Sequence, residues 1–126
     1  MEIIISNSSG KPIYEQITSQ IKAKIMDGEL KPGSALPSMR ALAKSLHLSV
    51  ITVQRAYEDL QRDGFIETTV GKGSFVSATN LNIYQEEQQK RIETLLIEAV
   101  DIARTNGIKI EKLQDLLTLF YEEDTL

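Results

Sequence analysis

The sequence predicts an α+β fold in which three helices and a β-hairpin are followed by an all-α pair of helices. Two segments with helical apolar spacing follow one another closely within residues 39–60. A glycine-rich link joins two segments rich in β-branched and aromatic residues between residues 65 and 77. Beyond residue 83, apolar residues again recur at helical spacing. We therefore expect one domain over residues 1–78 and a two-helix region over residues 79–126.

A Pro-Gly turn at Pro32–Gly33 precedes a helix that begins after Ser38. The hydroxyl of Ser38 is expected to accept a backbone N–H of the first turn as an N-cap. Arg40 in that turn opposes the helix dipole, so local stability does not explain it, whereas a phosphate at this helix end would. A solvated arginine is the alternative. The apolar stripe of this helix is expected to comprise Met39, Leu42, Ala43 and Leu46.

A further helix begins only a few residues later, which is the spacing of a helix-turn-helix. Ser49 is expected to be its N-cap, and Leu48 is placed to pack on Val53 as a hydrophobic staple. His47, the only histidine of the chain, falls in the turn. We interpret it as structural, because histidine tolerates the left-handed backbone conformation and no partners for a metal or catalytic role accompany it.

This second helix of the motif has a buried face and an exposed face. The buried face is expected to hold Val53, Ala56, Tyr57 and Leu60. The exposed face is expected to hold Ile51, Arg55, Glu58 and Arg62. An apolar side chain at the helix start is well placed to touch a thymine methyl in a DNA major groove, although single surface isoleucines are common. The neighbouring candidates for base contact are Thr52, Gln54 and Arg55.

A hairpin with a basic tip follows this helix. Gly64 is expected to end the helix, and residues 65–70 and 74–77 are expected to be strands joined through Gly71–Gly73. The two glycines let the backbone approach another surface, and Lys72 adds a positive charge, which suits a minor-groove or phosphate contact. An ordinary turn with a solubilising lysine is the alternative for the isolated motif. Directly behind a helix-turn-helix, the hairpin is interpreted as a wing.

Five blocks occur in order along the chain: Pro12–Ile17 of a first helix, Leu36–Ala43, Thr52–Leu60, Asp63–Gly64 and Gly71–Val76. Together they make residues 11–77 similar to the winged helix-turn-helix domain of the GntR family of bacterial transcription regulators. The resemblance implies a sequence-specific DNA-binding regulator that contacts double-stranded DNA through this domain. The resemblance and the residue patterns of the two helices and the hairpin together give the candidate DNA-contacting residues Ser38, Arg40, Lys44, Ser49, Val50, Ile51, Thr52, Gln54, Arg55, Gly71, Lys72 and Gly73.

The chain departs from the family pattern at three positions. Members usually carry polar or basic residues where this chain has Val50 and Ile51, and often glycine where it has His47. Aliphatic side chains offer methyl contacts in place of hydrogen bonds to guanine, which predicts half-sites that lean towards A·T pairs.

The net charge of −4 comes from the C-terminal part of the chain, residues 80–126. Residues 1–79 carry 9 Lys and Arg against 8 Asp and Glu, whereas residues 80–126 carry 5 against 10. A nearly neutral domain still binds DNA when its basic residues share one face, and affinity should then fall steeply with salt. The basic residues expected on that face are Arg40, Lys44, Arg55 and Lys72.

Residues 83–106 and 110–121 are expected to form two helices joined by a turn at Asn106–Gly107. Their apolar stripes are too extensive for two helices to bury alone, so we expect a second copy of the chain to cover them. Packing back onto the preceding domain is the alternative. The candidate dimer-interface residues are Ile92, Leu95, Leu96, Ala99, Val100, Ala103, Leu113, Leu116, Leu117 and Phe120.

In length and helical pattern this tail resembles the short C-terminal region of the YtrA-like subfamily of GntR regulators, where a helix pair dimerises the protein. The resemblance implies a homodimeric repressor that excludes polymerase from a pseudo-palindromic operator, often beside genes for transport systems. The tail offers no cluster of arginine, histidine or aromatic residues that would define an effector pocket, so a small-molecule effector is left open.

Composition excludes several classes of protein. Without cysteine the chain forms no disulfide, thiolate metal site or cysteine nucleophile, and we expect no metal ion or cofactor. No export signal or membrane-spanning run is recognisable, which predicts a cytoplasmic location. The only histidine of the sequence falls in a turn, and the sequence contains no glycine-rich phosphate-binding loop. We therefore do not expect this protein to be an enzyme. Two competing hypotheses are a winged-helix adaptor that binds proteins and a shortened relative of the aminotransferase-bearing GntR regulators, although no part of the sequence would hold pyridoxal phosphate.

Overall fold

A computed structural model describes residues 1–78 and 81–123. The chain divides near residue 80 into two compact units. The boundary predicted between residues 78 and 79 adjoins residues 79–80, which lie outside the described part of the chain.

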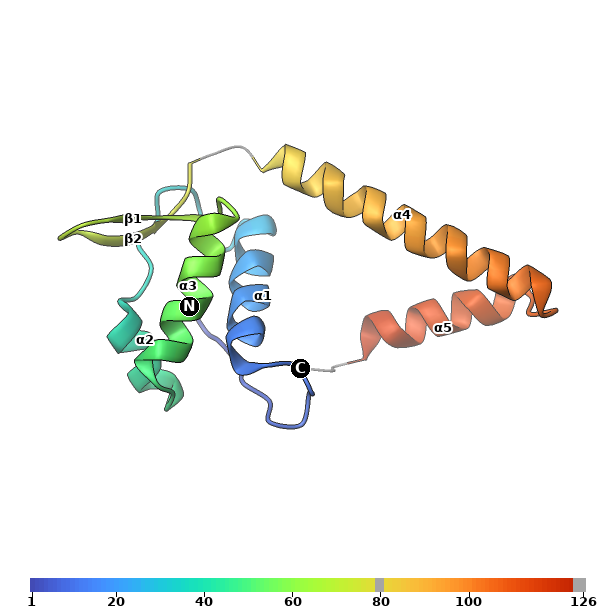
Figure 1. Ribbon diagram of the computed structural model, residues 1–126, viewed down its shortest axis with the longest axis horizontal. Helices are drawn as coiled ribbons and strands as arrows, with labels where there is room; N and C mark the ends of the chain where they lie inside the picture. The colour runs from blue at the N-terminus through green and yellow to red at the C-terminus, as the bar shows by residue number, and fades with distance from the viewer. Residues whose placement is uncertain (79–80, 124–126) are drawn as a thin grey trace. The chain divides into compact units, whose positions relative to one another are not determined.

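The N-terminal unit places its third helix at the centre (Figure 1). Its elements are α1 (Ile13–Met26), α2 (Met39–Leu46), α3 (Val50–Arg62), β1 (Ile66–Thr69) and β2 (Gly73–Val76). Because α3 packs against α1, α2 and β1, its apolar face forms the middle of the core. The largest fully buried side chains are Tyr57, Phe65, Ile17, Ile21, Leu60, Ile66, Gln16, Val53 and Val76. The predicted α+β fold, with three helices and a wing, is confirmed.

The predicted helix ends are present. The hydroxyl of Ser38 accepts the N–H of Ala41 at 3.0 Å, and that of Ser49 accepts the N–H of Thr52 at 3.2 Å. Both serines are therefore N-caps. His47 has a φ of 57°, so it adopts the left-handed conformation expected of the turn between α2 and α3. The path of the helix-turn-helix is thus set by local hydrogen bonds and one left-handed residue.

Tyr57 connects α3 to the segment that leads into α2. Its side chain is 1% exposed, and its hydroxyl donates a hydrogen bond of 2.7 Å to the carbonyl of Pro37. A buried hydroxyl that keeps its hydrogen bond stabilises the fold, whereas a phenolate at this place would lose its hydration. Burial accordingly raises the pKa of Tyr57 to about 12.

This shift predicts a loss of stability in alkaline solution. The unfolded chain releases the tyrosine proton near pH 10, whereas folded Tyr57 keeps it until about pH 12. The unfolded state then binds fewer protons, so the free energy of unfolding falls as pH rises through this window, by about 2–3 kcal/mol in total. Urea unfolding of wild type and Tyr57→Phe from pH 9 to 12 measures it. The variant should lack this part of the decline, and an equally steep decline would contradict the assignment.

The wing is an antiparallel hairpin that projects from the three helices (Figure 1). Its register pairs Ile66 with Val76 and Thr69 with Gly73. β1 is two residues shorter than the predicted 65–70, because the turn already begins after Thr69, where the N–H of Lys72 donates to the Thr69 carbonyl at 3.0 Å. β2 has the predicted four residues but begins and ends one residue before the predicted 74–77. Gly71, with a φ of 80°, supplies the positive φ that this turn requires.

A third segment, residues 33–36, pairs with the wing and was not predicted. The N–H of Val76 donates to the Ser34 carbonyl at 2.8 Å, and the N–H of Leu36 donates to the Ser74 carbonyl at 2.9 Å. The sequence pattern indicates only a turn in this region. Because these residues lead directly into α2, the pairing fixes the base of the wing beside the helix-turn-helix.

Two glutamines of α1 hold the N-terminal segment in place. The side-chain oxygen of buried Gln16 accepts the N–H of Ser6 at 2.9 Å, and its amide nitrogen donates to the carbonyls of Ser6 and Lys11. One turn later, Gln20 exchanges the same pair of hydrogen bonds with the backbone of Ile4. The segment before α1 is therefore bound along that helix, an arrangement that helical periodicity does not reveal.

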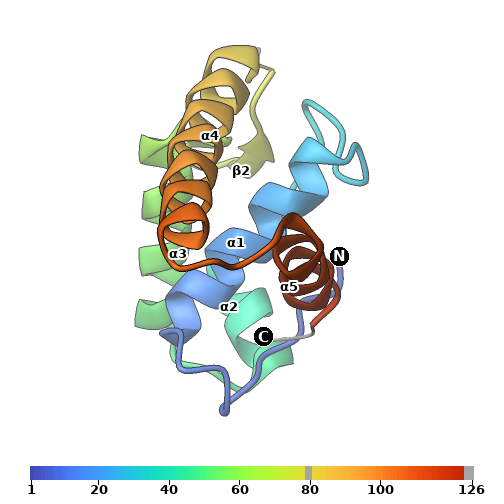
Figure 2. The ribbon, with the colours of Figure 1, turned by 90° about the vertical axis from the view of Figure 1, so that its right-hand side faces the viewer.

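The C-terminal unit consists of α4 (Asn82–Thr105) and α5 (Ile110–Glu122), within one residue of the predicted bounds. Gly107, with a φ of 71°, makes the turn, and the N–H of Ile108 donates to the carbonyl of Ala103 at 2.9 Å. The two helices meet at this turn and diverge from it (Figures 1 and 2). Among the described residues, no helix is long and apolar enough to cross a membrane.

Candidate nucleic-acid interface

The start of α3 presents an apolar tip to solvent. Ile51 is 78% exposed, and Val50 beside it is also exposed. The hydroxyls of Ser49 and Thr52 lie 2.9 Å apart and share a hydrogen bond, so both are held at the first turn. The predicted buried face, Val53, Ala56, Tyr57 and Leu60, is confirmed. The first turn of α3 therefore offers methyl groups and two hydroxyls, which suits contact with base edges.

Further along the exposed face, Gln54 and Glu58 are coupled. The amide nitrogen of Gln54 donates to a carboxylate oxygen of Glu58 at 3.1 Å. This hydrogen bond directs one hydrogen of the side-chain amide along the helix and leaves the side-chain carbonyl oxygen of Gln54 available as an acceptor. Helical periodicity places Glu58 on the exposed face but assigns it no role. Its link to Gln54 is visible only in the side-chain geometry.

Arg55 is not extended freely into solvent. Its guanidinium carbon lies 3.8 Å from the centroid of the Tyr14 ring, in the first turn of α1. This is a stacking contact between a planar cation and an aromatic face. The contact joins residues of two different helices far apart in the chain, so no local sequence pattern indicates it.

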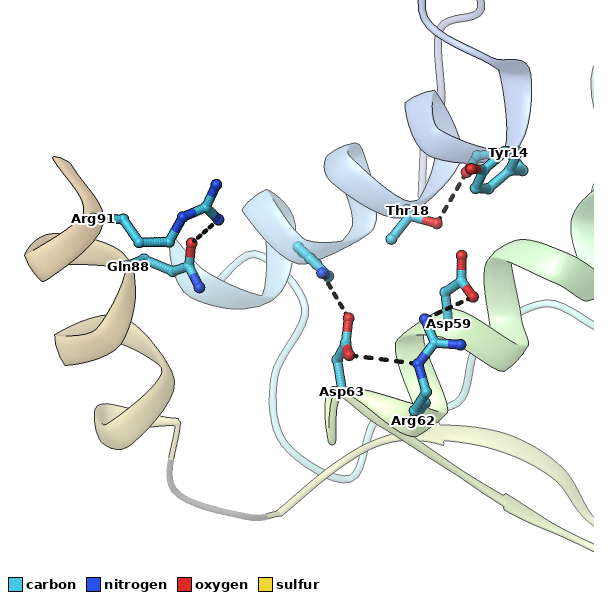
Figure 3. A network of polar contacts seen from close by, with 8 residues as sticks. Tyr14, Thr18, Asp59, Arg62, Asp63, Gln88 and Arg91 are labelled. Carbon is cyan, nitrogen blue, oxygen red and sulfur yellow. Dashed lines mark hydrogen bonds and ion pairs between the residues drawn. The ribbon is translucent and has the colours of Figure 1, made fainter. Parts of the chain in front are cut away.

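The basic residues of the N-terminal unit differ in whether they are paired with a carboxylate. Three are paired with carboxylates: Lys22 with Asp63 at 3.0 Å, Lys24 with Glu29 at 3.3 Å and Arg62 with Asp59 at 2.9 Å. Figure 3 shows Arg62 between Asp59 and Asp63. Within the described residues, no ion pair is formed by Arg40, Lys44, Arg55 or Lys72. The charges of the cations predicted to contact DNA are therefore not neutralised by these carboxylates, and they are available to attract an anion from outside the chain.

These unpaired cations are exposed and lie on three elements. Arg40 and Lys44 belong to α2, and Arg55 belongs to α3. Lys72 lies at the tip of the wing beside Val70, which is 98% exposed and was not predicted as part of the site. Gly71 has open space around the position of a Cβ, so its backbone conformation, not crowding, calls for glycine. The wing tip thus combines a cation, an apolar side chain and accessible backbone.

Comparison with known proteins identifies the family to which this domain belongs. The sequence model described as "Bacterial regulatory proteins, gntR family" matches residues 13–76, which span the three helices and the wing. The chain belongs to this family. Its similarity to one member extends beyond the domain: the chain is 37% identical over 113 residues to the HTH-type transcriptional repressor YtrA of Bacillus subtilis (strain 168), covering 90% of this chain and 87% of that protein.

A GntR family transcriptional regulator from Listeria monocytogenes has a similar structure: it matches 90% of this chain and 97% of its own, with 30% identity and a TM-score of 0.67. A transcriptional antiterminator from Listeria monocytogenes EGD-e matches 99% of this chain and 92% of its own, with 30% identity and a TM-score of 0.75. AraR(DBD) in complex with operator ORX1 matches 61% of this chain and 96% of its own, with 25% identity and a TM-score of 0.54. Members of the family are transcription regulators and not enzymes. This gntR-family chain is therefore a DNA-binding transcription regulator, and no observation favours the adaptor hypothesis.

Proposed function

We propose that this gntR-family regulator is a homodimeric repressor that binds a pseudo-palindromic operator in the cytoplasm, where the chromosome lies. Its two α3 helices enter successive major grooves on one side of the duplex, and the bound dimer excludes polymerase. The similarity of the chain to YtrA, a transcriptional repressor, supports repression over activation. Following the resemblance to the YtrA-like subfamily, we assign the operator to genes for transport systems and leave the effector unassigned.

The exposed apolar surface of α4 and α5 carries the proposal of a dimer. Leu95 on α4 is 60% exposed and Phe120 on α5 is 62% exposed. Burying such side chains against a second copy stabilises association by about 25 cal/mol per Å² of apolar surface. Ala103 is already 2% exposed within the single chain, so we assign it to the turn between the helices. The proposed interface comprises Ile92, Leu95, Leu96, Ala99, Val100, Leu113, Leu116, Leu117 and Phe120.

The proposed DNA contacts divide by chemistry. Phosphates are assigned to the start of α2, to Lys44 and to the wing, since helix N-termini and unpaired cations bind anions. Base edges are assigned to the first turns of α3. The complete set is Ser38, Arg40, Lys44, Ser49, Val50, Ile51, Thr52, Gln54, Arg55, Gly71, Lys72 and Gly73. Its support is the exposure of most of these residues and the absence of ion pairs at its cations within the described residues.

Selection of binding sites from random double-stranded DNA tests this proposal. We expect an inverted repeat whose half-site centres lie about one helical turn, or a multiple of it, apart. Within each half-site we expect A·T pairs where Val50 and Ile51 meet the groove, because thymine methyl groups pack on aliphatic side chains. Light scattering of the complex should show two protein chains per duplex. A single unrepeated site, or G·C-rich half-sites at those positions, would contradict the corresponding part of the proposal.

A further inference from the structure

The stack of Arg55 on Tyr14 fixes the direction of a cation on the recognition helix. A guanidinium that lies on a ring keeps its N–H groups in its own plane, where they are free to donate. At 3.8 Å from the ring centroid, the cation is therefore oriented without using its donors. Tyr14 is half-buried in α1. Its ring is therefore more restricted than the longer side chain of Arg55, which it can hold in one orientation.

The charge of Arg55 is not neutralised by its own helix. Glu58 and Asp59, three and four residues further on, are the carboxylates that a helical residue 55 would ordinarily meet. Glu58 accepts a hydrogen bond from the side-chain amide of Gln54 at 3.1 Å. Asp59 instead pairs with Arg62 at 2.9 Å (Figure 3), and within the described residues Arg55 forms no ion pair. An oriented and unpaired guanidinium with free donors is suited to bind an anion, and bidentate contact with phosphate is its strongest form.

The stack also draws Arg55 to one flank of α3. On a period of 3.6 residues, Ile51 and Glu58 lie near the middle of the exposed face, and Gln54 lies on the side away from Arg55. Tyr14 belongs to α1, so it pulls the guanidinium towards α1 and off this middle line. When such a helix lies in a major groove, the middle of its face meets the bases and its flanks meet the sugar-phosphate walls.

We propose that Tyr14 is a positioning residue that holds Arg55 against a DNA phosphate, so that Arg55 supplies affinity and not base specificity. This revises the sequence-based expectation that Arg55 reads bases. The inference rests on the proposed function, because it requires α3 to lie in a major groove. Specificity then falls to the residues at the tip and middle of the exposed face, above all Val50 and Ile51.

Binding measurements on Arg55→Gln test the phosphate assignment. The probes are a duplex selected from random DNA by the wild-type protein and a shuffled duplex of the same composition. We expect Arg55→Gln to lower the affinity for both by a similar factor, roughly 10- to 100-fold, and to lower the slope of log affinity against log salt by about 2 for a dimer. Lys24→Gln, which removes the same charge from a cation of α1 that is paired with Glu29 at 3.3 Å, should change both quantities little.

Variants of Tyr14 test the positioning role. Tyr14→Phe keeps the aromatic face and should bind as wild type does, whereas Tyr14→Leu should lose roughly 3- to 10-fold in affinity. In the Arg55→Gln background, Tyr14→Leu should cause no further loss, because the cation that it positions is gone. Thermal unfolding by circular dichroism verifies that each variant is folded, and the Arg55→Gln measurement does not depend on the stability of the Tyr14 variants.

Three outcomes would overturn the inference. One is a change in base preference when selection is repeated with Arg55→Gln, since a phosphate contact carries no sequence information. Another is an equal loss from Tyr14→Leu with and without Arg55, since Tyr14 would then act only on the fold. Failure of the wild-type protein to bind any selected duplex would overturn the proposed function as well, which distinguishes it from the first two.

Discussion

Replacing Leu95 and Leu96 together by aspartate is expected to convert the dimer into a monomer and to lower operator affinity by about 100-fold or more. Both side chains are exposed in the single chain and belong to the proposed interface on α4. In the dimer the two carboxylates would be buried without partners, at a cost that exceeds the lost apolar contact. Each monomer would then hold only one half-site, so binding of the second half-site would no longer be intramolecular.

Thr94→Asp is the matched control. It introduces one aspartate into the same helix, against two in the double variant, and residue 94 lies on the side of α4 opposite the stripe. The Thr94 hydroxyl donates a hydrogen bond to the carbonyl of Lys90 within its own helix, at 3.0 Å. Sedimentation should show a dimer for this control and a monomer for the double variant. A double variant that stays dimeric, or a monomer that binds the operator as tightly as wild type, would refute the assigned role of α4.

The features that the sequence predicted correctly have local causes. Ser38 and Ser49 each cap a helix through a backbone N–H three residues away, so a serine before an apolar helical stripe was sufficient to locate both starts. His47 and Gly107 adopt left-handed conformations within two residues of helix ends. The starts of α2 and α3 and both ends of α4 and α5 were therefore predicted to within a residue, whereas the extent of α1 was not predicted. The exposure of Ile51 followed from helical periodicity alone.

The features that the sequence missed depend on partners far along the chain. Ser34 bonds to Val76 of the wing, and nothing in the residues around Ser34 indicates that distant strand. Gln16 is polar yet fully buried, because backbone groups of the N-terminal segment satisfy its amide. The stack of Arg55 on Tyr14 has the same origin. Residue types on α3 could thus predict that it meets DNA, but the division between phosphate and base contacts needed the packing of α1 against it.

Neutralising two unpaired cations, as Arg40→Gln with Lys72→Gln, is the second change with a large expected effect. A dimer would lose four proposed phosphate contacts, and at about 1 kcal/mol each the operator affinity should fall roughly 1,000-fold. Because each contact releases about one counterion, the salt slope should decrease by about 4. Neither residue reads a base in the proposed complex, so the ranking of operator sequences should be unchanged. Titration of labelled duplexes over a range of salt concentrations measures all three quantities.

The pair Lys22→Gln and Lys24→Gln separates these contacts from the effect of net charge. It removes the same two positive charges per chain from the same unit, but these cations are already paired with Asp63 and Glu29 at 3.0 Å and 3.3 Å. Their fields are largely cancelled nearby, so we expect a change in affinity of only a few-fold. If both pairs of substitutions weakened binding equally, overall charge would explain the attraction to DNA. A large loss confined to Arg40 and Lys72 would instead locate the phosphate contacts at the start of α2 and at the wing tip.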